Sequence, residues 1–545
     1  MSAATTPPRQ DVTETGLRRV LIVAGVMAAA LMQTLDSTIT NVALPTIQGN
    51  LGASQEEGTW IVTAYTIAAI VVIPLTPWLQ NRFGRKNYFV ASIAGFTIAS
   101  VICGSADSLT LLVFARFVQG AFGGGLLATA QSILRDTFPP KQLGLSQGIF
   151  ALGAIMGPAL GPPLGGVLVD NYSWNWVFDI NIAPGIFSAI MLGLMLRDPE
   201  PGRASQVDFV GLLLLAAGLG SMQYVLTEGE PHYWFADPAV LTTSIVMVVS
   251  LCGFVYWELA GTKTPIVDLR VLRNRSVAAG SILGLALGTA IFGSTYILPQ
   301  FTQGPLGFTP TLSGLLFILR ALPIMLMTPL IVRFVGRVDP RVLLGSGFIL
   351  VSVGGWLQAI VTSGQSNFWS FAPSLIVTGV GSALLFIPLS IAVLGATTPQ
   401  DGPKAAAFIN LSLQLGGSIS VAALDVIIDR RWSFHSSVLS DDATLQSPAV
   451  QAFLQHGGTL GQLAGIVNSQ AAILASADAT LVLAVVWLWC SPLVLFMRRR
   501  PPPGASPGMQ TFLTVMGYKD YRPLKVAREI SHITSLGVGR TGCEP

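Results

Sequence analysis

The chain has 545 residues, of which 51% are hydrophobic and only 10% are charged, and its mean hydropathy is +0.64. Soluble domains carry about 25% charged residues, so this composition excludes an ordinary water-soluble protein and indicates one covered by a lipid bilayer. The net charge of +3 says little as a total. The placement of the charges is more informative, and we expect no nucleic-acid partner.

The N-terminus and the cysteines exclude several other classes. Residues 1–16 are polar and are expected to form a short disordered cytoplasmic leader. We expect no removable signal peptide, because the apolar run from Val20 to Pro45 is too long for a signal-peptide core and contains Asp36. The four cysteines are scattered singly, so we expect neither a disulfide framework nor a metal site. The sequence has no phosphate-binding loop of the Walker type, so ATP would not drive a pump of this kind, and no cofactor is expected.

A membrane-spanning helix needs about 20 mostly apolar residues, and the chain offers fourteen such segments in order. They fall near 18–43, 58–79, 88–106, 109–132, 143–169, 175–196, 207–227, 238–258, 277–302, 311–332, 341–362, 370–395, 404–427 and 475–497. The predicted fold class is therefore an all-α membrane protein with an even number of spans.

Lysine and arginine support this count independently, because they are in excess in cytoplasmic loops. With a cytoplasmic N-terminus, all but four of the 30 Lys and Arg residues fall on the cytoplasmic side. The exceptions are Arg116 and Arg320, inside spans, and Arg430 and Arg431, outside. Adding or removing one span would invert every later loop, so both termini are predicted to be cytoplasmic.

Two long segments lie outside the predicted spans. Residues 428–474 are expected to form a periplasmic loop, and its part from Gly461 to Ala475 has a helical composition that extends the last helix outward. Residues 498–545 are expected to form a loose cytoplasmic tail, because the Pro-Pro-Pro-Gly sequence at Pro501 ends the helix. The alternative is a tail that rests on the inner leaflet.

The first span carries polar side chains that are costly in a bilayer. Gln33, Asp36 and Thr40 lie on one helix face, followed by Asn41. A carboxylate at mid-membrane costs at least about 2.5–3.5 kcal/mol, so this face must look into the bundle or a water-filled cavity. Asp36 is the main candidate for a group that binds and releases a proton and, when charged, attracts a cation. The alternative is a structural carboxylate that never titrates.

Arg116 lies in the fourth span, with Gln119 on the same face three residues later. Because arginine cannot be neutralised, it must be paired, hydrogen-bonded or close to water. Two interpretations stay open: it holds a coupling carboxylate in its charged form, or it ties helices together at the membrane boundary. Arg320 in the tenth span raises the same question. Asp179 and Asp425, near the outer ends of spans six and thirteen, lie within reach of water and are weaker substrate-site candidates.

The fifth span combines regularly spaced glycines with prolines. The residues concerned are Gly153, Gly157, Pro158, Gly161, Pro162 and Gly165. Small residues four apart let another helix approach closely, and prolines remove backbone hydrogen bonds and allow bending. Packing explains the glycines, whereas the repeated Gly-Pro pairs favour a helix that must change shape.

A basic turn follows the second span and has a counterpart after the tenth, at 333–341. Its conformational candidates are Asn81, Arg82, Gly84 and Arg85. This faint repeat indicates two lobes of six spans, typical of transporters with a site at the midplane. The predicted boundaries are 17–200 for the N-terminal lobe, 201–276 for two inserted spans and a linker, and 277–497 for the C-terminal lobe.

Together these motifs resemble the major facilitator superfamily, and within it the fourteen-span drug–proton antiporters of the EmrB/QacA type. The sequence Leu-Asp-Ser-Thr-Ile-Thr-Asn-Val-Ala-Leu-Pro at 35–45 is similar to that group's first-span motif, and Arg116–Gly120 is similar to its fourth-span motif. The stretch Gly153–Gly166 is similar to the antiporter motif of span five, and 170–181 to the EmrB branch in particular. The resemblance covers about residues 17–497. It departs from the family pattern in the turn after span two, where Pro77 and Asn81 replace the usual glycine and aspartate.

The resemblance implies a proton-coupled multidrug exporter that works by alternating access, with Asp36 and Arg116 in proton coupling. It implies amphipathic drugs, dyes or toxic metabolites as substrates. Tentative substrate contacts are Gln33, Thr40, Asn41, Gln119, Asp179, Arg320 and Asp425. The implied location is the bacterial inner membrane, and the implied partners are the lipid bilayer, protons, a periplasmic adaptor and an outer-membrane channel.

Three alternatives remain open. The same fold serves proton-coupled uptake or export of a specific metabolite or siderophore. A membrane sensor would need a signalling domain, for which the tail is too short. An enzyme is disfavoured because no nucleophile–base pair or paired acidic motif lies within the spans, and all four histidines lie outside them.

Overall fold

The structure is a computed structural model that describes residues 16–139, 142–197, 208–230, 232–262, 265–334, 338–398 and 400–497. In this part of the chain, fourteen helical segments are long and apolar enough to cross a membrane, and no strand occurs. The predicted all-α fold with fourteen spans is therefore confirmed. The tail 498–545 and nearly all of the leader lie outside the described residues.

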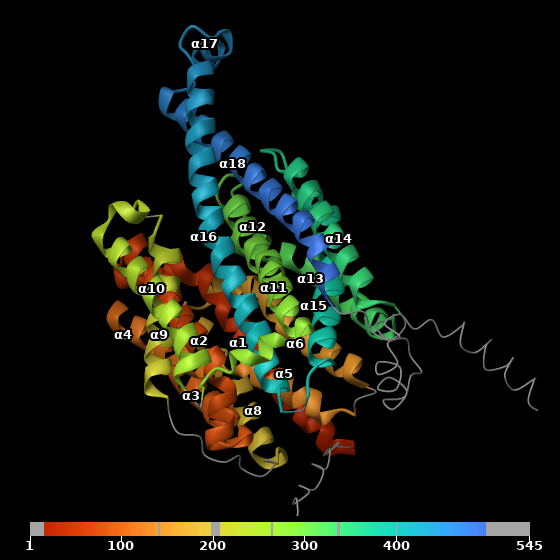
Figure 1. The fold of residues 1–545 in the computed structure, drawn as a ribbon. Coiled ribbons are helices and arrows are strands. Elements are labelled where there is room, and N and C mark those ends of the chain that lie inside the picture. The colour runs from red at the N-terminus through yellow and green to blue at the C-terminus, as the bar shows by residue number, and fades with distance from the viewer. Residues whose placement is uncertain are drawn as a thin grey trace, which may run out of the picture. The chain divides into compact units, whose positions relative to one another are not determined.

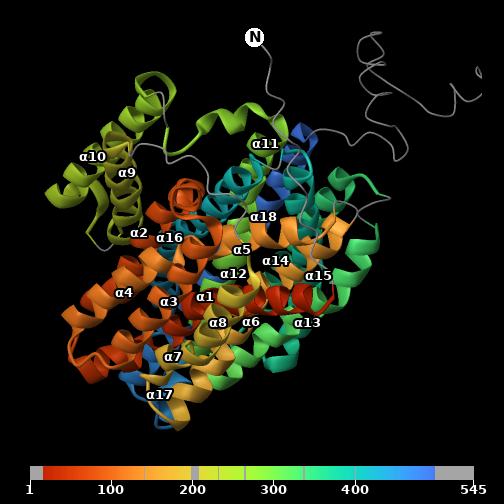
Figure 2. The ribbon, with the colours of Figure 1, turned by 90° about the horizontal axis from the view of Figure 1, so that it is seen from below.

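The first six spans pack against one another. They consist of α1 (Gly16–Leu51), α2 (Gln55–Phe83), α3 (Arg85–Gly104), the pair α4 (Leu109–Gly123) and α5 (Leu126–Thr137), α6 (Leu143–Asn171), and the pair α7 (Trp176–Asp179) and α8 (Ile182–Met195). Helix α1 contacts α6 and α8, while α4 contacts α2 and α3 (Figures 1 and 2). Polar residues of α1 thereby face helices on several sides.

Spans seven and eight, α9 (Phe209–Glu228) and α10 (Pro238–Tyr256), pack against each other. Helix α9 also contacts α2 and α16, so the pair lies at one side of the other spans (Figure 1). Aliphatic side chains fill the contact, among them Leu215 and Leu219 of α9 and Ile70 of α2.

The last six spans form a second packed group. They consist of α11 (Arg275–Gly288), which passes through a π-helical turn at Thr289–Gly293 into α12 (Ser294–Gln303), then α13 (Pro310–Phe334), α14 (Pro340–Val361), α15 (Ala372–Leu394), α16 (Gly402–Asp442) and α18 (Leu460–Cys490). The two groups meet where α6 contacts α13 and where α2 contacts α16.

The segment 428–474 is not the loop that its polar composition suggested. Helix α16 continues to Asp442, the short helix α17 (Pro448–Gln455) follows, and α18 begins at Leu460 (Figure 1). No glycine or proline lies between 418 and 447, so nothing in the sequence ends α16 earlier. Asp478 of α18 accepts a hydrogen bond of 2.6 Å from Arg431 Nε of α16, which joins the two helices beyond the bundle.

The turn after span two is shorter than the loop predicted for 80–87. Helix α2 runs to Phe83 and α3 begins at Arg85, so Gly84 alone separates them, with φ of 84°. This left-handed conformation favours glycine. Arg85 forms an ion pair with Asp136 at the end of α5, whereas Asn81 and Arg82 are exposed.

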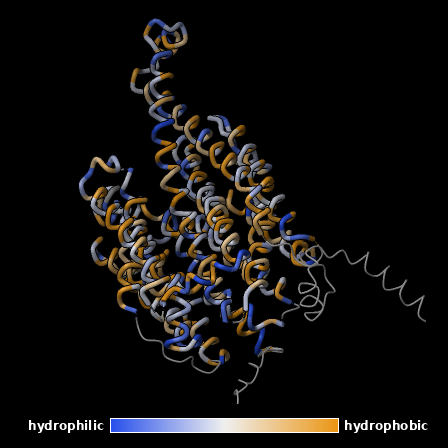
Figure 3. Tube along the Cα trace, in the orientation of Figure 1, coloured by the Kyte–Doolittle hydropathy of each residue, from blue (hydrophilic) through white to orange (hydrophobic). Residues whose placement is uncertain are grey.

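Hydrophobic residues are spread along all the spanning helices (Figure 3). Many large apolar side chains are exposed at the protein surface, including Leu213, Val249, Ile360 and Trp489. Lipid would cover these side chains, which explains how so apolar a chain stays folded.

Candidate functional site

Asp36 of α1 is completely buried, and three side chains from other helices donate hydrogen bonds to its carboxylate. Arg116 Nη1 of α4 lies 2.6 Å from Asp36 Oδ2. Gln119 Nε2 of α4 and Asn181 Nδ2, at the N-terminus of α8, lie 3.0 Å and 2.7 Å from Oδ1. These three donors take the place of water and stabilise the charged form of the carboxylate.

Arg116 is as deeply buried as its partner, with 1% of its surface exposed. Its Nη1 also lies 2.6 Å from Gln119 Oε1, and its Nε donates to the carbonyl oxygen of Ile61 in α2 at 3.1 Å. The guanidinium carbon lies 4.3 Å from the centre of the Tyr65 ring, a cation–π distance. Arg116 therefore keeps acceptors other than Asp36, which matters if the carboxylate loses its charge.

Ser100 of α3 orients the two amides. Its Oγ donates to the carbonyl oxygen of Phe96 and accepts from Gln119 Nε2 at 2.7 Å and from Asn181 Nδ2 at 3.3 Å. Each amide nitrogen has two N–H donors, so each uses one for Asp36 and one for Ser100. We call Asp36, Ser100, Arg116, Gln119 and Asn181 the carboxylate network.

Other residues predicted on the face of Asp36 lie at the edge of the carboxylate network. Gln33 Nε2 donates to the Tyr65 hydroxyl at 3.3 Å, and Thr40 donates to the backbone oxygen of Asp36 at 3.0 Å. Asn41 is exposed. Asp179 of α7 is half-buried, and within the described part of the chain it makes no hydrogen bond to the carboxylate network, although Asn181 is two residues away. Gln119, a tentative substrate contact, is fully buried inside the network.

Sequence reasoning missed Asn181, Ser100 and Tyr65. Asn181 is the last residue of the aromatic passage 170–181, so a signal for it was present in the sequence. Ser100 carries no such signal. Single serines are common in apolar helices, where the hydroxyl donates a hydrogen bond to a backbone carbonyl oxygen of the same helix.

The glycines of span five face α1. A Cβ atom on Gly157 would lie 2.1 Å from Thr34 Oγ1, and one on Gly161 would lie 2.2 Å from Thr38 Oγ1. The same stripe continues at Gly153 and Gly165, where a Cβ atom would meet Met27 and Ile39. Thr34 and Thr38 donate to the carbonyl oxygens of Gly153 and Gly157, both at 3.3 Å. The helix that carries Asp36 is therefore fixed directly against α6.

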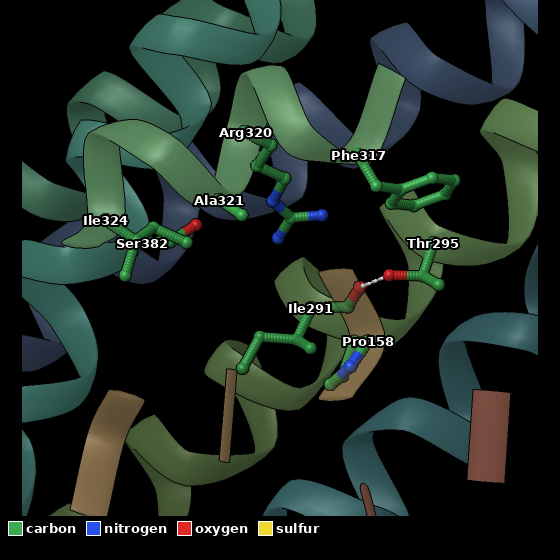
Figure 4. A pocket seen from close by; sticks show the side chains of 8 residues that line it. All are labelled: Pro158, Ile291, Thr295, Phe317, Arg320, Ala321, Ile324 and Ser382. Atoms are coloured by element: carbon green, nitrogen blue, oxygen red, sulfur yellow. Dashed lines mark hydrogen bonds between the residues drawn. The ribbon is translucent and has the colours of Figure 1, made fainter. Parts of the chain in front are cut away.

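Arg320 of α13 is 8% exposed and donates from Nη2 to the carbonyl oxygen of Ala290 at 3.2 Å. It points into a small cavity whose lining also includes Pro158 of α6 and Thr295 of α12 (Figure 4). Asp425 of α16, expected to be an ordinary solvated carboxylate, is half-buried and accepts a hydrogen bond from the Tyr296 hydroxyl. Tyr296 of α12 therefore lies against α16 at this carboxylate.

A second buried polar cluster connects the first and last six spans. Gln131 Nε2 of α5 donates to Gln147 Oε1 of α6 at 3.1 Å and to Ser390 Oγ of α15 at 3.2 Å. Asn410 Nδ2 of α16 donates to Gln131 Oε1 at 3.0 Å. Nearby, the Arg135 guanidinium donates to the carbonyl oxygen of Thr397 at 2.9 Å. Among the described residues, no group of three or more His, Cys, Asp or Glu side chains is arranged to hold a metal ion.

Comparison with known proteins relates most of the chain to one family. The Major Facilitator Superfamily matches residues 26–421. The multidrug export protein EmrB of Escherichia coli (strain K12) is 32% identical over 502 residues, which cover 90% of this chain and 98% of that protein. The fatty acid resistance protein FarB of Neisseria gonorrhoeae is 33% identical over 497 residues, which cover 88% of this chain and 96% of that protein.

Solved structures show the same fold at lower identity. A bacterial homolog of the human lysosomal transporter Spinster, in an inward-facing and unoccupied conformation, matches with a TM-score of 0.55 and 17% identity. The human organic anion transporter MFSD10 matches with a TM-score of 0.55 and 13% identity. Each match covers 90% of this chain and 100% of the other.

Proposed function

The chain belongs to the Major Facilitator Superfamily, and we propose that it is a secondary multidrug exporter that exchanges amphipathic small molecules for protons. Its likeness to EmrB of E. coli along nearly the whole of both chains supports export as the direction of transport. The buried ion pair of Asp36 and Arg116 supports protons as the driving ion, because a charge buried inside a span is seldom kept without use.

Proton binding at Asp36 would change the carboxylate network in a defined way. A neutral carboxyl group attracts Arg116 less strongly, and Arg116 retains the Gln119 and Ile61 oxygens as acceptors. The helices α1 and α4 are then held together less tightly. We propose that this weakening lets α1 move with α6, to which the glycine stripe fixes it.

Alternating access would use the two helix groups as lobes. We assign 17–200 to the N-terminal lobe, 201–276 to the inserted pair with its linker, and 277–497 to the C-terminal lobe. The lobes would rock at the α6–α13 and α2–α16 contacts. The turn containing Asn81, Arg82, Gly84 and Arg85, and the prolines Pro158 and Pro162 of α6, are the proposed conformational elements.

The distribution of Lys and Arg supports the bacterial inner membrane with both termini in the cytoplasm. The α16–α18 extension would then lie in the periplasm. We propose it as a contact for a periplasmic adaptor that leads to an outer-membrane channel, because α16 and α18 carry it beyond the bundle (Figure 1).

The test uses inside-out membrane vesicles with a panel of fluorescent amphipathic compounds of both charges. Wild type is expected to accumulate substrate when the lumen is acidified and to release lumenal protons when substrate is added. Asp36→Asn is expected to lose this coupling while folding normally, and Asp107→Asn, which changes an exposed carboxylate, is expected to keep it. Coupling that persists in Asp36→Asn would make Asp36 structural, and uptake in the opposite direction would make the protein an importer.

A further inference from the structure

We propose that Arg320 is an anion-binding residue, and that the exporter's substrates include amphipathic acids whose carboxylate or similar anionic group binds its guanidinium. The inference rests on the proposed function, because it names a substrate class for the proposed exporter. It stands on the geometry of the cavity in Figure 4.

Arg320 carries a buried charge that no carboxylate in the described part of the chain neutralises. Arginine has five N–H donors and cannot be deprotonated in proteins. Among the described residues, its side chain has one hydrogen-bond acceptor, the carbonyl oxygen of Ala290, and no ion-pair partner. Arg116, the buried arginine in the fourth span, has a carboxylate, an amide and a carbonyl as acceptors. Arg320 thus lies in a membrane span with most of its donor capacity unused, which is costly unless a ligand or water uses it.

Among the residues that line the cavity, Arg320 is the main hydrogen-bond donor available to a bound molecule. Thr295 and Ser382 direct their hydroxyl protons to the carbonyl oxygens of Ile291 and Thr378 in their own helices, at 2.6 Å and 2.8 Å. The remaining lining residues, such as Phe317 and Ile324, are apolar, and none is acidic. A fixed guanidinium in apolar walls suits a molecule with an anionic group and a hydrophobic body.

The backbone around Arg320 is built to hold the guanidinium in place. Its acceptor Ala290 lies in the π-helical turn Thr289–Gly293, and such turns occur often at functional sites. Gly379 of α15 lets the two helices touch, since a Cβ atom there would lie 2.4 Å from the Arg320 carbonyl oxygen. The arginine is therefore fixed between three helices instead of lying on a mobile surface.

The cavity also lies between the proposed lobes. Pro158 comes from α6, whereas Ile291, Thr295, Phe317 and Ser382 come from the last six spans. In this conformation the cavity has a volume of about 20 Å³, enough for about one water molecule. A larger molecule would enter when α6 and α13 separate, so access to Arg320 would alternate with the state of the lobes.

The test compares three probes of one shape: 1-pyrenebutyrate, its methyl ester, and a pyrenyl quaternary amine of the same length. Equilibrium binding to the purified full chain is followed by pyrene fluorescence. We expect the wild type to bind the carboxylate about 10- to 100-fold more tightly than the ester, as for a hydrogen bond to a charged group. Equal affinities for acid and ester would overturn the proposal, and this comparison needs no variant.

Substitutions test whether Arg320 causes the preference for the carboxylate probe. Arg320→Gln is expected to lower the carboxylate affinity by about 10- to 100-fold without changing the affinity for the ester, and Arg320→Lys is expected to be intermediate. Arg333→Gln, which removes an exposed arginine from the last turn of the same helix, is the matched control and should change nothing. An Arg320→Gln protein that is monodisperse and still binds the carboxylate with wild-type affinity would overturn the assignment.

Transport of the same probes separates the two proposals. If wild-type vesicles exchange the quaternary amine for protons but neither bind nor move the carboxylate, the exporter stands and the anion site is wrong. If no probe of any charge is transported, export is wrong, and the equilibrium comparison of acid and ester still decides whether Arg320 binds anions.

Discussion

Gln131 of α5 and Ser390 of α15 lie 259 residues apart in the chain, yet their side chains are joined by a hydrogen bond of 3.2 Å. Both residues are buried, and Asn410 of α16 bonds to the other end of the Gln131 amide. The first and last six spans are therefore held together by a polar contact that the protein must break whenever this region opens. Each such bond contributes roughly 1 kcal/mol.

We predict that Gln131→Leu shifts the protein toward a conformation in which these ends of the lobes are apart. Spin labels at the exposed positions Arg82 and Arg333, one in each proposed lobe, would report a longer distance distribution than in wild type. The control is Gln80→Leu, because the Gln80 amide bonds to Thr129 within the first six spans. Identical distributions for both variants would show that the cluster does not control opening.

The ion pair of Asp36 and Arg116 predicts strong non-additivity. Arg116→Gln leaves a buried carboxylate without its counter-ion and is expected to destabilise the protein by about 3–5 kcal/mol. Adding Asp36→Asn to that variant should recover much of this loss, while coupled transport stays absent. Unfolding in a mild detergent measures the free energies.

The control for this cycle is Arg85→Gln, which breaks the partly exposed pair with Asp136 and should cost no more than about 1 kcal/mol. If the double variant were as unstable as the sum of the two single variants, the pair would have no coupling energy, and the mechanism proposed for proton binding would be wrong.

The glycine stripe predicts a position-specific packing defect. Gly157→Ala places a methyl group 2.1 Å from Thr34 Oγ1 and must push α1 and α6 apart. We expect a loss of about 1–3 kcal/mol in stability, as for an overpacked core, together with slower transport. Gly193→Ala in α8, where no atom lies within 4 Å of the new methyl group, is expected to leave the thermal unfolding temperature unchanged or to raise it. Equal effects would attribute the loss to helix propensity instead of packing.

The sequence predicted the spans and singled out Asp36 and Arg116 as buried charges inside them, because long apolar segments and the rare charged residues within them can be recognised from the sequence alone. It did not predict that the two residues form a pair, since their contact depends on how the helices of the first six spans are arranged around Asp36. Ser100 and Gln131 were missed for the same reason: small or neutral polar residues cost little in a helix, and their role appears only when a partner from another helix is placed beside them.

The extension of α16 shows that polarity alone does not predict where a helix ends. Most of its residues from 428 to 442 are polar, which suggested a loop, but this composition indicates only that the segment leaves the membrane. Whether the helix stops there depends on glycine and proline, which are absent until Pro448.

The linker between spans eight and nine predicts a weak dependence of stability on pH. Lys404 Nζ at the start of α16 lies 2.8 Å from Asp268 Oδ2. Partial burial opposes ionisation of this carboxyl group, but the hydrogen bond and the charge of Lys404 outweigh it and lower the pKa of Asp268 below its ordinary value of 3.8. The pair therefore stabilises the linker at neutral pH, and this contribution is lost as the pH falls through the lowered pKa.

Asp268→Asn removes the charge but keeps an oxygen to accept the hydrogen bond from the backbone N–H of Arg270. Because the pair is partly exposed and screened by solvent, we expect the variant to be less stable than wild type by at most about 1 kcal/mol at pH 7. The difference should shrink in high salt and vanish below the pKa of Asp268, since wild type then carries a neutral carboxyl group as well. Thermal unfolding of both proteins across pH, at low and high ionic strength, measures it. A difference that persisted in acid would mean that Asp268 acts through packing and not through its charge.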